Sequence, residues 1–286
     1  MGFSSFRDYA EDASDRGQYW MSFMYKTGTP VLPAAGRWGD VSMSAGTPKY
    51  NAYVGSQGEA TPLYGSGNNG IYAGESVAPL TKHLNRILLQ TNGATFAPAK
   101  FVLCDYLMFY PLTDMDSTDL QEFVQAATLP RYANGKGVQV MLVSTVPQTA
   151  NATCTISYTN QDGTPGRTST FTILGPSNVG NLLTSGSTAA GGSNPFIPLQ
   201  SGDYGVRSVE SIQLAASAGG FCSIVLVQTI SSFLIRETNT ATEHFYLKHK
   251  PSLPQVQDGA HLNFIFSSGV AAASSILRGE LEFYWG

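Results

Sequence analysis

The sequence predicts a mainly β protein, an antiparallel β-sandwich of jelly-roll type with an N-terminal helix and a long irregular arm. Two observations lead to this prediction. Apolar and polar residues alternate with a period of two in short stretches, and Gly, Asn, Asp and Pro separate these stretches, as in strands joined by hairpins. The stretches are 101–110, 138–146, 153–159, 167–174, 205–215, 221–235, 261–266 and 279–285. Short strands at this spacing, joined by crossing loops, are typical of a jelly roll.

The composition supports a sheet protein with a weakly charged surface. Charged residues make up 13% of the 286 residues and hydrophobic residues 42%. A chain with so little charge cannot cover itself with salt-bridged helices, so Ser, Thr, Asn and Gly must form much of its surface. A surface of this kind suits burial against partner chains. The net charge of −4 and the absence of a basic run argue against nucleic-acid binding.

The chain opens with a predicted amphipathic helix over residues 3–16. Apolar residues recur at helical spacing at Phe6, Tyr9, Ala10 and Ala13. Gly17 ends the helix. A dense aromatic cluster follows, formed by Tyr19, Trp20, Phe23 and Tyr25.

Residues 27–75 show little periodicity and are rich in Gly, Pro and Ser. So long an irregular span is unusual inside a compact domain, and its aromatic residues argue against a flexible linker. We therefore expect a helix and extended arm over 1–75 and a β-sandwich domain over 76–286. Seven residues of the first part are predicted assembly contacts: Phe6, Tyr9, Trp20, Phe23, Trp38, Tyr50 and Tyr53. The alternative is that the arm packs only on its own domain.

Two stretches are less regular. Residues 79–90 combine helical spacing at Leu80, Leu84 and Ile87 with a loop-like lead-in, which leaves helix and strand open. Residues 116–127 are predicted to form a short helix capped by Asp116 or Ser117. The Gly- and Ser-rich stretch 175–193 is a candidate contact loop.

The cysteines, the first residues and the apolar runs give expectations about disulfides, a signal peptide and membrane helices. Cys104, Cys154 and Cys222 are odd in number and lack CxxC spacing, so we expect free, buried thiols rather than disulfides or a zinc site. The start is polar and then charged, so no signal peptide is expected. The longest apolar run, 221–235, is interrupted by polar residues and falls short of the ~20 residues of a membrane helix.

No motif for catalysis or metal binding is found. The acidic cluster Asp114, Asp116 and Asp119 lacks the Gly and Glu that a calcium loop requires, and helix capping explains it without metal. The four histidines have no HExxH spacing, and no G-x-S-x-G or phosphate-binding loop is present. We therefore expect a non-enzymatic protein with no catalytic residues, no metal and no cofactor.

Several turns and strand ends carry a resemblance across nearly the whole chain. They are Met1-Gly2-Phe3-Ser4-Ser5, Gly36-Arg37-Trp38, Thr81-Lys82-His83, Leu103-Cys104-Asp105 to Tyr110-Pro111, Leu129-Pro130-Arg131-Tyr132, Tyr158-Thr159-Asn160-Gln161-Asp162-Gly163, Pro195-Phe196-Ile197-Pro198-Leu199-Gln200 to Val209, and Leu253-Pro254 to Asp258-Gly259-Ala260. With these the chain resembles a group of tailed-bacteriophage virion structural proteins, either capsid-associated or tail-associated. The resemblance implies a component of the phage particle and brings no catalytic residues.

The leading expectation is a capsid decoration or cement protein that acts through homo-oligomeric contacts, a trimer being one option, and through contacts with other virion proteins such as the major capsid protein. A tail, collar or baseplate protein is the alternative within the class. The competing class is a carbohydrate-binding receptor-recognition module, in which Trp20, Trp38, Tyr50 and Tyr53 stack on sugars. The expected location is the virion, after synthesis in the host bacterial cytoplasm, with no nucleic-acid or membrane partner.

Overall fold

The computed structural model describes residues 5–14, 17–65, 69–93, 96–184, 194–246 and 253–286. It is mainly β, built from antiparallel sheets, which confirms the coarse fold class. The elements in chain order are α1 (Phe6–Ser14), β1 (Tyr19–Lys26), β2 (Trp38–Asp40), the 3-10 helix η1 (Val41–Met43), β3 (Gly46–Thr47), β4 (Thr61–Pro62), β5 (Lys82–Thr91), β6 (Ala99–Asp114), β7 (Gln121–Glu122), β8 (Val138–Val146), β9 (Ala152–Asn160), β10 (Arg167–Ile173), β11 (Asn181–Leu182), β12 (Val206–Leu214), β13 (Phe221–Ile235), β14 (Thr242–Phe245), β15 (Leu262–Ser268) and β16 (Leu277–Trp285).

At the centre of the molecule the strands form a closed circuit, which we call the central ring. The long strand β13 pairs with β8 on one side and with β6 on the other, and the circuit runs β13-β8-β11-β2-β15-β6 and back to β13. Side chains that point into the ring pack against one another. They include Trp38, Tyr106, Met141, Val225 and Ile265. The ring therefore encloses a core of its own.

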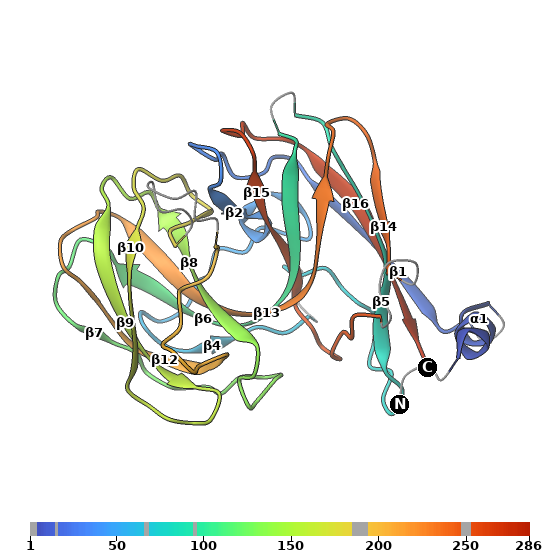
Figure 1. Cartoon of the computed structure of the whole chain (residues 1–286), viewed down its shortest axis with the longest axis horizontal. Coiled ribbons are helices and arrows are strands. Elements are labelled where there is room, and N and C mark those ends of the chain that lie inside the picture. The colour runs from blue at the N-terminus through green and yellow to red at the C-terminus, as the bar shows by residue number, and fades with distance from the viewer. Residues whose placement is uncertain (1–4, 15–16, 66–68, 94–95, 185–193, 247–252) are drawn as a thin grey trace.

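A separate sheet covers each side of the central ring (Figure 1). The distal sheet has the order β10-β9-β12-β7, and the terminal sheet, named for its first and last strands, has the order β14-β5-β16-β1-β3. The distal sheet buries Ile156 and Val209 against Leu226 of the ring. On the other side, Leu281 of the terminal sheet packs with Phe101 of the ring. Burial of each such side chain contributes about 1.5–3 kcal/mol, so the three layers stabilise one another.

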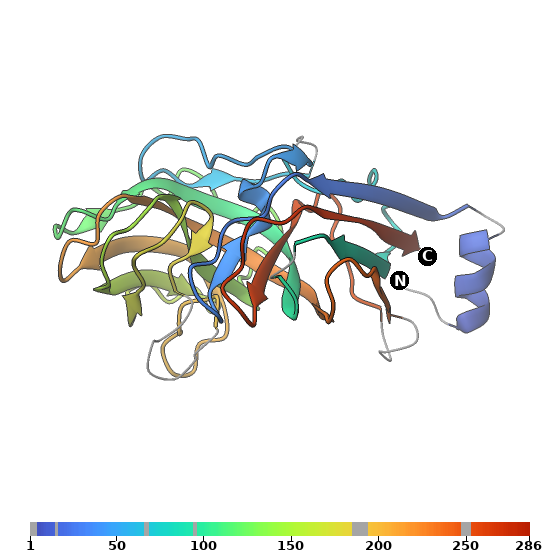
Figure 2. The same ribbon diagram turned by 90° about the horizontal axis from the view of Figure 1, so that it is seen from above.

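The terminal sheet joins the two ends of the chain. β1 pairs with β16 along its whole length, from Tyr19 opposite Tyr284 to Lys26 opposite Leu277. α1 lies beyond the end of this sheet, next to the C-terminus of the chain (Figures 1 and 2). Residues 1–75 also supply β2 and β4, which pair with β15 and β6. The irregular stretch thus runs through the layers formed by the rest of the chain.

Most predicted strands occur where the alternation placed them. The stretch 138–146 matches β8, and 221–235 matches β13. The open choice at 79–90 resolves as the strand β5. The predicted helix at 116–127 is wrong, because this stretch is irregular apart from β7, which pairs with β12 at Gln121 and Glu122.

The three cysteines are free and buried, as predicted. Burial raises the pKa of the Cys154 thiol to about 12 and raises the pKa of Cys104 and Cys222 as well. Within the described residues, no helix is long and apolar enough to cross a bilayer.

Candidate interaction surface

The exposed aromatic residues gather on β1. Its odd-numbered residues point away from the core, since Ser22, Met24 and Lys26 are buried between them. Three of the outward rings are largely open to solvent: Phe23 is 67% exposed, Tyr19 50% and Tyr25 46%. Single exposed apolar residues are ordinary, whereas a contiguous row of them is a candidate interaction surface. We call the outward residues Tyr19, Met21, Phe23 and Tyr25, together with Trp20 on the opposite face of the same strand, the β1 surface.

Charged residues lie beside this row and not within it. Glu282 and Glu280 of β16 stand opposite Met21 and Phe23. Arg86 of β5 pairs with both of them, at 3.4 Å and 2.6 Å, and with Glu243 of β14 at 3.1 Å. The outer face of the terminal sheet is therefore divided into a charged interior and an uncharged aromatic border.

The border is also a sheet edge. On its far side β1 pairs only with the two-residue strand β3, at Tyr25 and Lys26. Among the described residues no strand pairs with the open side of β1 from Tyr19 to Met24. Open edges are usually shortened, bulged or guarded with charge, and this stretch has none of these protections.

Under this edge lies a groove of about 350 Å³, lined by Trp20, Met21, Ser22, Phe23, Thr47, Pro48, Gly70, Ile71 and Tyr72. Trp20 is 40% exposed and meets the Tyr72 ring edge-on, with the ring centroids 5.5 Å apart. Its Nε1 donates to the Ser22 hydroxyl at 3.0 Å, and that hydroxyl donates to the Tyr72 carbonyl. The groove is therefore held open by an aromatic pair and a short polar chain.

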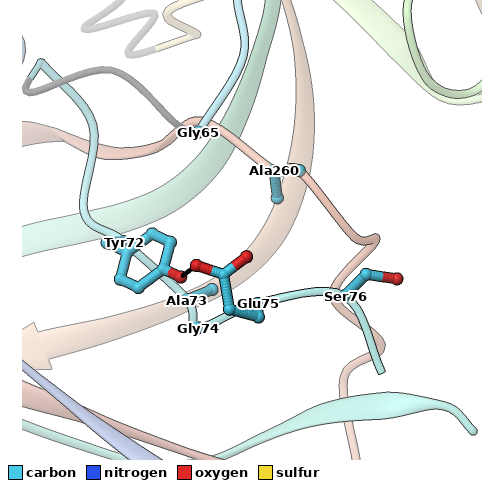
Figure 3. Close-up of a pocket in the computed structure, with 8 residues that line it drawn as sticks. Gly65, Tyr72, Ala73, Gly74, Glu75, Ser76 and Ala260 are labelled. Atoms are coloured by element: carbon cyan, nitrogen blue, oxygen red, sulfur yellow. Dashed lines mark hydrogen bonds between the residues drawn. The ribbon is translucent and has the colours of Figure 1, made fainter. Parts of the chain in front are cut away.

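Tyr72 also lines a second pocket of about 520 Å³, bordered by Gly65, Ala73, Gly74, Glu75, Ser76, Gly259 and Ala260 (Figure 3). The Tyr72 hydroxyl donates to the Glu75 carboxylate, and this hydrogen bond raises the pKa of Tyr72 to about 12. Glu75 is the only carboxylate among the residues that line either pocket. Glycoside hydrolysis normally requires two carboxylates across the bond that is cleaved, so neither lining set supplies that chemistry.

The wall of this second pocket is fixed from behind. The buried Lys82 Nζ donates to the Gly74 and Glu75 carbonyls at 3.3 Å and 2.8 Å and lies 3.3 Å from the Asp258 carboxylate. Asp258 in turn accepts a hydrogen bond from the Ser76 hydroxyl at 2.7 Å. These contacts hold residues 74–76 in place.

Of the predicted assembly contacts, Trp20 and Phe23 lie on the β1 surface, and Tyr50 is exposed. Tyr9 anchors α1. Its ring lies 5.1 Å from that of Tyr284, and its hydroxyl donates to Asn85 at 2.8 Å. The side chain of Phe6 lies outside the described part of the structure.

Trp38 and Tyr53 are placed differently, in the core of the central ring, where each is 2% exposed. The Tyr53 hydroxyl donates to the Asp40 carboxyl, as does Tyr106 at 2.8 Å. Burial raises the pKa of Asp40. The sequence led us to expect that a neighbouring chain buries Trp38 and Tyr53, but at these two positions the chain buries its own side chains.

Sequence reasoning named the cluster of Tyr19, Trp20, Phe23 and Tyr25 but did not select Tyr19, Met21 or Tyr25 as contacts. The available signal was the alternation of large apolar residues at 19, 21, 23 and 25, which predicts one strand face. Tyr72 had no such signal, because its position beside Trp20 depends on the path of the irregular arm.

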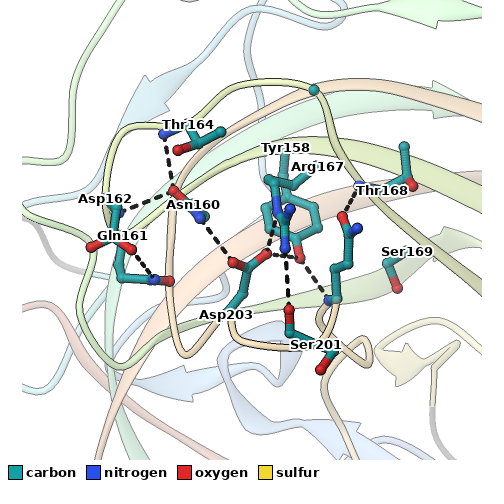
Figure 4. A network of polar contacts seen from close by, with 12 residues as sticks. Tyr158, Asn160, Gln161, Asp162, Thr164, Arg167, Thr168, Ser169, Ser201 and Asp203 are labelled. Atoms are coloured by element: carbon teal, nitrogen blue, oxygen red, sulfur yellow. Dashed lines mark hydrogen bonds and ion pairs between the residues drawn. The ribbon is translucent and has the colours of Figure 1, made fainter.

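A polar network at the opposite end of the molecule is structural. Asp203 accepts hydrogen bonds from Tyr158 at 2.7 Å, Asn160 at 2.8 Å and Arg167 at 2.9 Å (Figure 4). Burial alone would raise the pKa of Asp203, but these hydrogen bonds outweigh it and hold the pKa below its usual value. Arg167 also donates to the Ser201 carbonyl at 3.2 Å. The network fixes the turn before β12 to the strands β9 and β10.

Comparisons with known proteins give little further information. No family model matches the chain, and no curated protein matches it. The solved structures that match include a subviral particle of infectious bursal disease virus VP2, at 9% identity over 93% of this chain and 80% of that chain, with a TM-score of 0.17. A structure of the Gt strain of the same virus matches at 10% identity over 93% and 80%, also with a TM-score of 0.17. At such TM-scores the likeness carries no argument about fold or function.

Proposed function

We propose that this chain is a non-enzymatic structural component of a bacteriophage particle, a capsid decoration or cement protein that acts through contacts with other protein chains. The resemblance of its turns and strand ends to phage virion proteins suggests the setting. Action through protein contacts is supported by the β1 surface, where an uncharged aromatic row coincides with a sheet edge that no charged residue protects.

The energetics favour a protein partner for this surface. Tyr and Phe each bury 150–250 Å² when fully covered. Phe23, Tyr19 and Tyr25 are about half exposed or more, so a partner that covers them removes roughly 200–300 Å² of apolar surface from water. At about 25 cal/mol per Å², this contributes on the order of 5–8 kcal/mol before the costs of association. Backbone groups at the open edge add a directional component that only another protein chain satisfies along its length.

The finer fold class belongs to the same proposal. We assign the layered sheets to the jelly-roll type, because strands that follow each other in the chain repeatedly lie in different sheets, as β5 and β6, β7 and β8, and β8 and β9 do. Tracing the strand order in an experimental density map tests this assignment.

The direct test is the composition of purified particles. Quantitative mass spectrometry of phage banded on a density gradient should find this chain in many copies per particle, in a fixed ratio to the major capsid protein. A chain that is abundant in infected cells but missing from the particles would overturn the proposal. A ratio that matches the tail or baseplate proteins would support a tail position and reject the decoration role.

Carbohydrate recognition is the second candidate, favoured by the Trp20–Tyr72 pair beside the Glu75 carboxylate. Aromatic faces next to hydrogen-bonding groups suit sugars. A glycan array separates the two candidates. Retention of a defined glycan by the wild-type protein but not by Trp20→Ala would favour the sugar site, whereas no retention leaves the groove to a protein partner.

A further inference from the structure

We infer that β1 pairs edge to edge with β1 of a second copy of this chain, in antiparallel orientation about a two-fold axis at Met21. This inference rests on the proposed role of the β1 surface in protein contacts and specifies both the partner and the register.

The backbone determines which residues are able to pair. The Trp285 amide donates to the Gln18 carbonyl, and hydrogen-bonding residues alternate along an antiparallel pair. The backbone groups of even-numbered residues therefore face β16, and those of Tyr19, Met21 and Phe23 face the open side. The Thr27 amide, which donates to Ala45 beside β3, fits the same alternation.

The position of β3 then limits the register. β3 occupies the open side at Tyr25, so a new strand has access only to residues 19–23. An antiparallel copy centred on Met21 uses all three open positions. It places Tyr19 opposite the partner's Phe23, Met21 opposite the partner's Met21, and Phe23 opposite the partner's Tyr19, with about six backbone hydrogen bonds in all. A two-fold contact of this kind closes on itself and produces a dimer rather than a fibre.

The side chains are self-complementary in this register. Two aromatic cross-strand pairs form on the outer face, and such pairs stabilise sheets. On the inner face the partner's Trp20 lies opposite Ser22, where the groove of about 350 Å³ beside Ile71 and Tyr72 is open to receive it. No charged residue occurs between Gly17 and Tyr25, so the strand meets its own copy without like-charge repulsion.

Charges at the ends of the strand favour the same orientation. The sequence of α1 holds Asp8, Glu11 and Asp12 against one Arg7, and α1 lies beyond the N-terminal end of β1 (Figure 2). In the antiparallel pair this end of the partner approaches β3, where Lys49 is exposed. The end of the partner strand that leads to α1 therefore lies toward a basic side chain at each end of the contact.

The register gives a sharp test by disulfide cross-linking. Met21→Cys places two thiols directly opposite each other, with Cα atoms about 5.5 Å apart, within the range that a disulfide spans. Tyr25→Cys is the matched control on the same face, because Tyr25 lies outside the paired residues 19–23 and its two copies lie roughly 26 Å apart along the strands. The three native thiols are buried and give a low background.

Under mild oxidation with oxidised glutathione, the Met21→Cys protein should form a disulfide-linked dimer on a non-reducing gel, and the Tyr25→Cys protein should not exceed the wild-type level. Equal linking of both variants, or no linking of either, would overturn the inference. Sedimentation of the wild-type protein separates this failure from failure of the proposed function. If the wild-type protein forms oligomers but Met21→Cys forms no disulfide, the contact lies elsewhere on the chain, and the proposed structural role is not affected.

A second variant distinguishes edge pairing from face-to-face packing. Met21→Pro removes an amide that faces the open side and none that faces β16, and proline is tolerated at such edge positions. It should weaken dimerisation at least ~10-fold, whereas Leu88→Lys, on the same face of the terminal sheet but remote from the edge, should leave it unchanged. If both variants weaken dimerisation alike, the contact involves the whole face and the edge inference is wrong.

Discussion

The buried ion pair of Asp105 and Arg131 should contribute strongly to the stability of the fold. The Asp105 carboxylate accepts hydrogen bonds from Arg131 Nε at 2.8 Å, from Arg131 Nη2 at 2.7 Å and from the His261 backbone amide at 2.9 Å. The Asp105 side chain is fully buried and that of Arg131 nearly so. The pair attaches the segment before β8 to the central ring.

Asp105→Asn removes the charge and keeps the shape. Loss of one partner of a buried pair usually costs 3–5 kcal/mol, because the other charge stays buried without compensation. Arg131 keeps its hydrogen bonds to the Leu63 and Tyr106 carbonyls, at 3.1 Å and 3.0 Å. We therefore expect the lower end, about 3 kcal/mol.

Equilibrium urea unfolding measures this loss as a lower midpoint with an unchanged slope. Glu11→Gln is the control, because it breaks the exposed pair with Arg7 and should change stability by less than about 0.5 kcal/mol. A double replacement, Asp105→Leu with Arg131→Met, should recover much of the loss. A loss below about 1 kcal/mol for Asp105→Asn would show that the buried ion pair contributes little to stability.

Three further predictions concern acid stability, the thiols and the β1 surface. Hydrogen bonds lower the pKa of Asp203 in the folded state, so their stabilisation is present above the unfolded pKa of about 3.9 and is lost as the pH falls through the folded pKa. In urea unfolding, the difference in stability between the wild type and Asp203→Asn should be constant from pH 7 to pH 5 and should shrink towards pH 3. A difference that does not shrink would contradict this. Cys104, Cys154 and Cys222 should resist a thiol reagent in the native protein and all react in denaturant, whereas rapid native labelling would show that they are accessible. Phe23→Ser should leave unfolding within about 0.5 kcal/mol of the wild type, because the ring is mostly exposed, yet weaken self-association; unchanged sedimentation would argue against a role for this ring.

The strands were predictable where apolar and polar residues alternate regularly. β9 alternates buried and more exposed residues along its whole length, and its bounds, Ala152–Asn160, enclose the predicted stretch 153–159. β5 was ambiguous for a physical reason. Its pairing with β16 shifts register at Glu282 and Phe283, which places a bulge at Asn85. The bulge changes the parity of the strand, so Leu84 and Ile87 face the same core at a spacing of three and imitate a helix.

The false helix at 116–127 has an equally local cause. Asp and Ser residues favour both helix caps and turns, because their side chains bond nearby backbone amides. Here they form turns: the Asp116 amide donates to the Asp114 carboxylate at 2.8 Å, and the Asp119 amide donates to Ser117 at 3.1 Å. Pairing of Gln121 and Glu122 with β12 then excludes the helix.

The candidate surface was predictable only in part. The aromatic cluster at 19–25 was visible in the sequence, but its separation into an exposed face and a buried face required the pairing of β1 with β16. The fate of Trp38 and Tyr53 was not predictable, since their neighbours in the central ring come from β6, β8, β13 and β15, far away in the chain. The residues next to Trp38 and Tyr53 in the sequence do not indicate these contacts.

The proposed place of this chain in a phage particle is tested by cryo-electron microscopy of the purified particle. We expect density for this chain in the particle, with Tyr19, Phe23 and Tyr25 covered by another protein chain. A particle without this chain, or one in which the β1 surface faces open solvent, would contradict it.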